Sequence, residues 1–157
     1  MTDIETFQVL RTDNHHPDFI TLVQLLDKEL WQRNGSDMDF FQKFNIINDV
    51  DTVVVAYHGN EAAGCGCFKK FDNNSVEIKR MFVIEAKRKS GIASSILNEL
   101  ESWAKELNYL NIVLETGIRL PEAVNLYLKN GYEITEKWGQ YIGVENSICM
   151  RKQLNTT

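Results

Sequence analysis

The clearest chemical signal in the chain is a cationic loop, in which Lys87, Arg88 and Lys89 follow one another and Gly91 comes shortly after. Apolar residues at helical spacing begin directly after this glycine, which predicts a helix whose first backbone N–H groups lack intrahelical partners. Such groups and the positive end of the helix dipole bind anions, and a glycine lets a phosphate approach the backbone because it has no Cβ atom. The cations would add charge-assisted donors. The loop therefore predicts a phosphate site, and the alternative is a solvated basic loop in which Gly91 only eases the turn.

Two elements must position this loop, a strand before it and a long helix after it. The strand is predicted from Val76 to Val83, where side chains alternate between two faces that are both partly apolar. The helix follows Ser90-Gly91 and extends to Leu107, with apolar residues three and four positions apart. A buried strand is predicted from Asn111 to Leu114. The order strand, helix, strand therefore predicts a parallel crossover.

The rest of the chain supplies further strands and helices around this crossover. The turn signals His58-Gly59-Asn60 and Asp72-Asn73-Asn74 separate extended runs and predict an antiparallel meander. Pro17 and Pro121 lie where helices begin, and Asn130-Gly131 closes the second of these helices. The predicted fold class is therefore mixed α+β, with helices that shield the sheet. The other predicted elements are strands at Phe7–Leu10, Thr52–Tyr57, Ala62–Phe71 and Ser147–Leu154, and helices at Phe19–Leu30, Asp39–Phe44 and Pro121–Lys129.

Length and composition limit the class of protein. A chain of 157 residues fits one domain, so residues 1–157 are predicted to form a single domain. With 17 Lys+Arg and 22 Asp+Glu the net charge is −5, which disfavours nucleic acid and anionic membranes as partners. The apolar runs are too short to span a bilayer and no export segment is recognisable, so a cytoplasmic location is predicted. The cysteines, Cys65, Cys67 and Cys149, are odd in number and are predicted to be reduced thiols.

A family resemblance adds to this interpretation. Arg88-x-x-Gly91-x-Ala93, directly after the predicted strand, resembles the acyl-CoA pyrophosphate loop of the GNAT superfamily of N-acetyltransferases. Further along, Leu114-Glu115-Thr116-Gly117 resembles a later strand of the family. The helix that carries Leu126-Tyr127, followed by Gly131-Tyr132, resembles the helix that comes after that strand, in order and at suitable distances. The resemblance covers roughly residues 50 to 155, and the first 45 residues resemble the family in layout alone.

The resemblance implies a fold and an acyl donor. The fold would be the acyl-CoA N-acyltransferase fold, a mostly antiparallel central sheet with one splayed parallel strand pair and helices on both faces. Acetyl-CoA would be the donor, with its pyrophosphate on backbone N–H groups of the loop and its pantetheine arm added along the strand edge. An N–H of Phe82 or Val83 would steady the thioester oxygen. The implied cofactor-binding residues are Met81, Phe82, Val83, Arg88, Lys89, Ser90, Gly91, Ile92, Ala93 and Ser94, with Ser95 as an alternative hydroxyl.

Glu77 is the candidate general base. A primary amine with a pKa of about 10.4 is protonated at neutral pH, so its attack on a thioester requires a group that accepts the proton. Glu77 lies on the same strand as the implied thioester-binding residues and would act through a water molecule. The alternative is an exposed strand carboxylate that pairs with Lys79 or another cross-strand cation.

Tyr127 is the candidate general acid. A departing CoA thiolate resembles a cysteine thiolate with a pKa of about 8.5, and a phenol with a pKa near 10 donates a hydrogen bond or a proton to it. The alternative is a core aromatic residue whose hydroxyl group is satisfied within the protein.

One position departs from the family pattern. Many members carry an amide side chain seven residues before this tyrosine, where it binds the pantetheine, and this chain has Leu120 there. Asn125 does not replace it, because two residues correspond to about 200° around a helix. The predicted function is an N-acetyltransferase that moves acetyl from acetyl-CoA directly to an amine of a small molecule or peptide. The alternative, which the missing amide motivates, is a non-catalytic acyl-CoA-binding or sensory module.

Other candidate sites and partners are weaker. The expected partners are acetyl-CoA and an amine acceptor, and homodimers are common among such proteins. Trp138 to Tyr141 and Trp31 to Met38 are candidate walls of an acceptor cleft, which surface packing explains nearly as well. Cys65 and Cys67 share one side of a strand but fall short of a zinc site, so no metal is predicted. His15 and His16 precede the first helix, where a cap or an exposed loop is expected.

Overall fold

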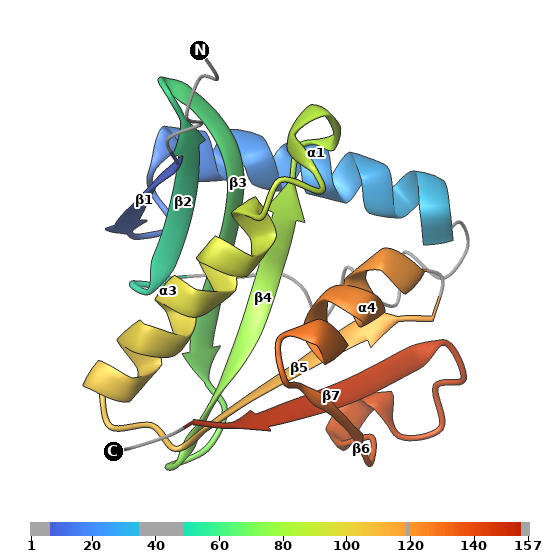
Figure 1. The fold of residues 1–157 in the computed structure, drawn as a ribbon. Coiled ribbons are helices and arrows are strands. Elements are labelled where there is room, and N and C mark those ends of the chain that lie inside the picture. Colours follow the sequence, from blue (N-terminus) through green and yellow to red (C-terminus); the bar gives the residue numbers. More distant parts are fainter. Residues whose placement is uncertain (1–6, 35–48, 119, 155–157) are drawn as a thin grey trace. The chain divides into compact units, whose positions relative to one another are not determined.

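The computed structural model describes residues 7–34, 49–118 and 120–154. Within these ranges seven strands form one mixed sheet in the order β1-β2-β3-β4-β5-β7-β6, and β4 and β5 are its parallel pair (Figure 1). The strands are β1 Phe7–Thr12, β2 Val53–His58, β3 Glu61–Lys70, β4 Ser75–Val83, β5 Asn111–Gly117, β6 Glu133–Thr135 and β7 Ser147–Gln153. The helices are α1 Pro17–Asn34, α3 Ile92–Glu106 and α4 Pro121–Lys129, with short 3-10 turns η2 Glu85–Lys87 and η3 Gly139–Tyr141.

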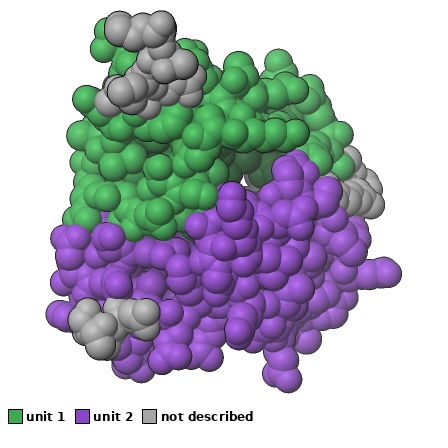
Figure 2. All heavy atoms as spheres, viewed as in Figure 1, with its two compact units in different colours: residues 1–68, 79–100 green, residues 69–78, 101–157 purple. Residues whose placement is uncertain are grey.

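The chain divides into two compact units, which Figure 2 shows in separate colours. Unit 1 consists of residues 1–68 and 79–100, and unit 2 of residues 69–78 and 101–157. Strands β3 and β4 and helix α3 each contribute residues to both units. The single domain expected over residues 1–157 stays a prediction.

The core of unit 1 forms where α1 packs on the strands. Apolar residues at helical spacing place Phe19, Leu22 and Leu26 on one face of α1, and all three are buried. They pack in one cluster with Val53 and Val55 of β2, together with Cys65 and Cys67 of β3 and Phe82 of β4. Because side chains alternate along a strand, this cluster covers one face of β3 and leaves Gly64 and Gly66 on the other face.

Helix α3 approaches that second face of β3 through two glycines. A Cβ atom at Gly64 would lie 2.8 Å from the Phe82 carbonyl oxygen and 3.0 Å from Cδ1 of Ile96. At Gly66 it would lie 2.5 Å from Sδ of Met81 and 3.0 Å from Cγ2 of Ile96. Small residues in β3 are therefore what allows Ile96 to pack against the strand.

Strand β4 carries a backbone irregularity at Arg80. This residue has φ +60°, a left-handed conformation that is uncommon for a residue with a Cβ atom. The guanidinium group of Arg80 donates to Oδ1 of Asp27 on α1 at 2.5 Å. A left-handed residue interrupts the extended backbone of a strand, and the regular alternation of side chains depends on that extended backbone. The simple alternation that the sequence predicts for this strand therefore ends at Arg80.

Unit 2 is built on the parallel pair and the antiparallel strands beside it. Residues 75–77 of β4 pair in parallel with residues 111–113 of β5, so that Glu77 lies opposite Val113. Strand β5 pairs antiparallel with β7, and Glu115 lies opposite Cys149. Strand β6 then pairs with the outer edge of β7. These registers fix which side chains of unit 2 share a face of its sheet.

Most predicted elements are confirmed with small changes of boundary. Pro121 begins α4 and Asn130-Gly131 ends it, with Gly131 at φ +92°, as the sequence predicts. The parallel crossover through α3 is confirmed by the pairing of β4 with β5. Strand β6 was not predicted, because its residues are exposed and few. The expected helix at 39–44 lies outside the described residues. No helix among the described residues is both long and apolar enough to cross a membrane.

We expect Gly64→Ala to destabilise the protein more than Gly66→Ala does. At Gly64 the new methyl group meets a backbone carbonyl that cannot rotate away, whereas at Gly66 it meets first the flexible thioether of Met81. Overpacking of this kind costs about 1–3 kcal/mol. Chemical denaturation of the two variants beside the wild type measures the difference, and a larger loss for Gly66→Ala would contradict the packing described for α3.

A second expected outcome concerns Tyr57, whose hydroxyl group donates to Oδ2 of Asp18 at 2.6 Å. Burial, with the hydrogen bond and the charge of Asp18, raises the pKa of Tyr57 to about 12. The folded state therefore holds this proton more tightly than the unfolded state, so the stabilisation is complete below about pH 10 and is lost toward about pH 12. The wild type should exceed Tyr57→Phe in free energy of unfolding at pH 8, and the gap should close over this interval. A gap that stays constant to pH 12 would show that the folded state does not hold the Tyr57 proton more tightly than the unfolded state does.

Candidate functional site

The cationic loop of unit 1 forms an open turn at the start of α3. Gly91 has φ +89°, and no heavy atom of the described residues lies within 4 Å of the position that a Cβ atom would take there. The helical hydrogen bonds begin with Ser95 N–H, which donates to the Gly91 carbonyl at 3.0 Å. The N–H groups of Gly91, Ile92 and Ala93 precede this bond and point out of the helix end. The turn is therefore shaped to receive an anion against bare backbone.

The side chain of Arg88 braces this turn instead of extending into solvent. Its Nε donates to the Val83 carbonyl at 2.8 Å, and Nη2 lies 2.8 Å from Oε1 and 2.9 Å from Oε2 of Glu29 on α1. The guanidinium carbon lies 5.6 Å from the centre of the Phe82 ring. The backbone N–H of Arg88 already donates to the Glu85 carbonyl at 3.3 Å. Arg88 thus holds the loop to β4 and α1, and the N–H groups after it are the ones directed at an anion.

The other cations of the loop have different environments. Lys87 places its ammonium 3.9 Å from Oε2 of Glu61, and the side chain of Lys89 is exposed. Lys89 has φ +65°, and Ser90 donates its hydroxyl to the Lys87 carbonyl. The turn therefore depends on left-handed residues at positions 89 and 91, which point successive N–H groups toward one side.

The end of β4 presents backbone groups on two edges. Ile84 N–H donates to the Ala63 carbonyl of β3 at 2.9 Å. Because the hydrogen-bonding direction alternates along a strand, the backbone of Phe82 also faces β3, and the backbones of Met81 and Val83 face the other edge. The Val83 carbonyl accepts from Arg88 on that edge. Met81 and Val83 are thus better placed than Phe82 to pair with an added extended ligand.

Two carboxylates share one face of the sheet in unit 2. Glu77 lies opposite Val113, and Glu115 stands two residues further along β5 on the same side. Cys149 lies opposite Glu115 on β7. Glu77 is only 5% exposed, so it is a buried and not an exposed strand carboxylate. The face is therefore acidic and largely removed from water.

The charge of this pair acts on neighbouring groups. Burial raises the pKa of Tyr141, and the negative charges of Glu115 and Glu77 raise it further. Burial also raises the pKa of Cys149, with the same two carboxylates acting in that direction and Lys137 opposing them. Both Tyr141 and Cys149 therefore stay protonated near neutral pH, and Cys149 is a poor nucleophile. Because the charges of Glu77 and Glu115 both act on Tyr141 and on Cys149, these four side chains form one cluster.

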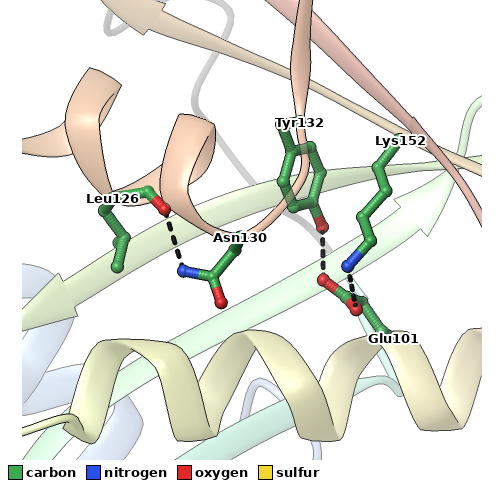
Figure 3. A network of polar contacts seen from close by, with 5 residues as sticks. All are labelled: Glu101, Leu126, Asn130, Tyr132 and Lys152. Carbon is green, nitrogen blue, oxygen red and sulfur yellow. Dashed lines mark hydrogen bonds and ion pairs between the residues drawn. The ribbon is translucent and has the colours of Figure 1, made fainter.

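Tyr127 stands on α4 with its ring buried and packed edge-on against Tyr132, with 5.7 Å between the ring centres. Tyr132 donates to Oε2 of Glu101 at 3.0 Å, and Lys152 donates to Oε1 of the same carboxylate at 2.8 Å. Figure 3 shows Tyr132 and Lys152 pointing toward Glu101 from the C-terminal part of the chain. The same view shows the Asn130 amide bonded to the Leu126 carbonyl at the end of α4. This network fixes Tyr132, and through it one side of the Tyr127 ring.

Burial raises the pKa of Tyr127, and the charge of Glu115 adds to the shift. The phenol therefore keeps its proton throughout the physiological range and remains a hydrogen-bond donor. The burial of its ring is also what a core aromatic residue would show. Leu120 precedes α4 with its apolar side chain half-buried, and Asn125 is exposed.

The weaker candidates have structural roles where they are described. His16 accepts from the Asp18 N–H through Nδ1 at 3.1 Å and thus caps α1, as expected. The three cysteines are free and buried, and the thiols of Cys65 and Cys67 face carbonyl groups of β4. The described residues contain no cluster of three or more His, Cys, Asp or Glu side chains suited to a metal ion.

Sequence reasoning missed Glu115 and gave Tyr141 only a general place in an acceptor cleft. Glu115 lies in the segment Leu114–Gly117, whose family resemblance implies a strand and gives this carboxylate no role. No neighbouring residue in the sequence distinguishes its carboxylate from one that faces solvent. The signal is the alternation along β5, which places Glu115 on the same face as the residue paired with Glu77. Trp138 packs against Tyr141 at 6.2 Å and against Phe71 at 5.3 Å between ring centres, so the aromatic stretch does line this cluster.

The sequence is similar to a known protein family and to individual members of it. The model of the acetyltransferase (GNAT) family matches residues 16–132. The uncharacterised N-acetyltransferase YsnE of Bacillus subtilis (strain 168) is 33% identical over 101 residues, which cover 63% of this chain and 67% of YsnE.

Two solved structures are also similar. One is a Klebsiella pneumoniae protein provisionally described as an acyl-CoA N-acyltransferase, with a TM-score of 0.76 and 25% identity over 96% of this chain and 99% of that one. The other is a Bacillus anthracis protein provisionally described as a streptothricin acetyltransferase, solved in complex with acetyl coenzyme A. Its TM-score is 0.60 and its identity 25%, over 72% of this chain and 68% of that one.

The bracing of the loop by Arg88 leads to a double-mutant prediction. Arg88→Ala and Glu29→Ala should each lower the free energy of unfolding, and the double variant should lose less than the sum of the two. Because both side chains are about a third exposed, we expect a coupling energy of about 0.5–1 kcal/mol. Lys89→Ala is the matched control, since its exposed side chain should contribute less than about 0.5 kcal/mol. Additive losses would show that the ion pair does not hold the loop.

Proposed function

The chain belongs to the GNAT acetyltransferase family and is an N-acetyltransferase that takes its acyl group from acetyl-CoA; we propose that it transfers acetyl directly to an amine of a small molecule or peptide, assisted by Tyr127 and Glu77. The observation that carries the proposal is the open turn at Gly91, where the position of a Cβ atom has no described heavy atom within 4 Å and a donor phosphate has room to approach the backbone. The proposal includes two further features. One is a cytoplasmic location, which three free cysteines support, and the other is a homodimer.

The loop of unit 1 would hold the diphosphate of the donor. The N–H groups from Lys89 to Ala93 would supply the hydrogen bonds, and the Ser94 hydroxyl group would add one more. A Cβ atom at Gly91 would meet no described atom, so the space beside the turn suits a group that must approach the backbone closely. Arg88 would act by holding the turn in this shape, since its guanidinium group bonds Glu29 and the Val83 carbonyl.

The edge of β4 would hold the pantetheine arm. The backbones of Met81 and Val83 face away from β3, and an extended amide chain pairs with such an edge like an added strand. The Val83 N–H would then stabilise the thioester oxygen as negative charge develops on it. Phe82 would contribute through its ring, which packs beside Arg88. No amide side chain is available at Leu120, so the backbone edge would supply these contacts.

When bound, acetyl-CoA supplies a thioester whose carbonyl carbon is attacked by the amine nitrogen, which forms the C–N bond and breaks the C–S bond. Glu77 would accept the proton that the amine loses, through a water molecule. Its burial favours this role because a carboxylate shielded from bulk water interacts more strongly with a nearby amine. The thiolate would leave with the help of Tyr127, whose hydroxyl group donates to the sulfur.

The raised pKa of Tyr127 makes its contribution more specific. The phenol is always protonated at physiological pH, which guarantees a donor for the leaving sulfur. Full proton transfer to a thiolate of lower pKa is uphill, so we propose that stabilisation by the hydrogen bond is the larger part of its effect. The thiolate then takes its proton from solvent after release, which balances the reaction.

We expect Tyr127→Phe to lower kcat by about 10²–10⁴-fold while the KM for acetyl-CoA changes little, because the hydroxyl group acts on the leaving sulfur and not on the diphosphate. Thiol release across a panel of primary amines measures turnover. Stabilisation against heat by acetyl-CoA, about 2.7 kcal/mol at a hundred times its dissociation constant, measures binding.

Tyr109→Phe is the matched control, since this phenol lies in the turn after α3 and has no proposed role. Unchanged turnover of Tyr127→Phe at every pH would overturn the assignment of the acid. A wild-type protein that binds acetyl-CoA and acetylates no amine would instead favour a non-catalytic acyl-CoA-binding module.

A further inference from the structure

The role proposed for Tyr127 requires a ring that is held in place without the help of its own hydroxyl group, because that group has to donate to the leaving sulfur. The ring is buried, and Tyr132 packs edge-on against it with 5.7 Å between the ring centres. The Tyr132 N–H also donates to the Tyr127 carbonyl at 3.0 Å. Tyr132 thus contacts Tyr127 through both its ring and its backbone, and its position determines where one side of the Tyr127 ring lies.

Tyr132 is in turn fixed by a buried carboxylate. Its hydroxyl group donates to Oε2 of Glu101 on α3 at 3.0 Å, and the residue is 2% exposed. Burial and the negative charge of Glu101 raise the pKa of Tyr132, so its phenol keeps the proton and remains a donor. A hydrogen bond to a charged acceptor is roughly twice as strong as one between neutral groups, and a site shielded from water strengthens it further. The Tyr132 ring therefore has one favoured orientation.

Lys152 of β7 completes this network. Its Nζ donates to Oε1 of Glu101 at 2.8 Å and lies 5.6 Å from the centre of the Tyr132 ring. Figure 3 shows the Tyr132 and Lys152 side chains pointing toward the two oxygens of Glu101. Because a buried carboxylate is stable only when it is paired and hydrogen-bonded, Lys152 allows Glu101 to occupy this position. Within unit 2 the network therefore ties α3 and β7 to the segment between α4 and β6.

We propose that Tyr132 is a positioning residue for acetyl transfer: held by Glu101 and Lys152, it orients the ring of Tyr127 so that the phenol hydroxyl group meets the leaving sulfur. This inference rests on the proposed function and adds to it a residue that acts through Tyr127. A hydrogen bond weakens steeply outside a narrow range of distance and angle, and a small displacement of a catalytic group lowers the rate of the chemical step. Loss of the Tyr132 hydroxyl group should therefore lower kcat and leave the KM for acetyl-CoA unchanged.

The test is a cycle of four proteins: the wild type, Tyr132→Phe, Tyr127→Phe and the double variant. Tyr132→Phe keeps the ring and removes the hydroxyl group that bonds Glu101, so kcat should fall about threefold to tenfold while the KM for acetyl-CoA stays within about twofold. In the Tyr127→Phe background the same substitution should leave kcat unchanged, because the hydroxyl group that Tyr132 positions is absent. A residue that acted through stability alone would lower kcat by the same factor in both backgrounds. Thiol release with the primary amine that the wild type acetylates fastest measures kcat.

Variants of Glu101 separate positioning from folding. Glu101→Gln keeps an oxygen that accepts from Tyr132, so it should retain more of the wild-type kcat than Glu101→Ala does. Unfolding midpoints with and without acetyl-CoA establish that each variant is folded and binds the donor at the assay temperature. Glu99→Ala is the matched control, because Glu99 lies on the same helix and pairs with Arg11 at 3.0 Å. This control should leave kcat unchanged.

The outcomes distinguish this inference from the proposed function. A wild-type kcat for Tyr132→Phe, together with a slow Tyr127→Phe, would overturn the positioning role and leave Tyr127 as the acid. Equal factors of loss in the two backgrounds, or a Glu101→Gln variant as slow as Glu101→Ala, would also overturn it. Wild-type turnover of Tyr127→Phe would count against the proposed acid itself, and the positioning role would fall with it.

Discussion

The backbone hydrogen bonding of β4 is the constraint on which the rest of the structure depends. Its first residues pair with β5 in parallel, and its last residues lie beside β3, so one strand must satisfy partners with different geometries. The left-handed residue Arg80 accommodates this change within the strand, and its ion pair with Asp27 fixes the irregularity to α1. Strain of this kind persists only where surrounding contacts determine it, as they do here.

The two ends of β4 have opposite electrostatic character. In unit 1 the strand leads into a turn whose bare N–H groups and exposed Lys89 favour an anion. In unit 2 it carries Glu77, and β5 adds Glu115 on the same face, which favours a cation. A net charge of −5 conceals this separation. One strand therefore joins a cationic turn to an acidic sheet face in a chain that is acidic on average.

The sequence was sufficient for the elements that local chemistry determines. Pro121 begins α4 and Gly131 follows its end, because proline suits a first turn and glycine a left-handed conformation, and Gly91 marked the turn before α3 for the same kind of reason. The sequence was insufficient where the alignment of strands that are distant in the chain decides which side chains meet. An arginine gives no local signal for a left-handed conformation, and the meeting of Glu77 and Glu115 depends on how β4 and β5 align. Glu29, the partner of Arg88, is 59 residues away in the chain and had no signal at all.

The burial of all three cysteines has a practical consequence for biochemistry on this protein. Burial raises the pKa of Cys65 and of Cys149, so neither offers much thiolate to an aromatic disulfide reagent while the fold is intact. Colour developed by such a reagent in a continuous assay would come from liberated coenzyme alone. The same reagent added without substrate would measure the rate of global unfolding, because the protein's own thiols react only in molecules that have lost their native packing.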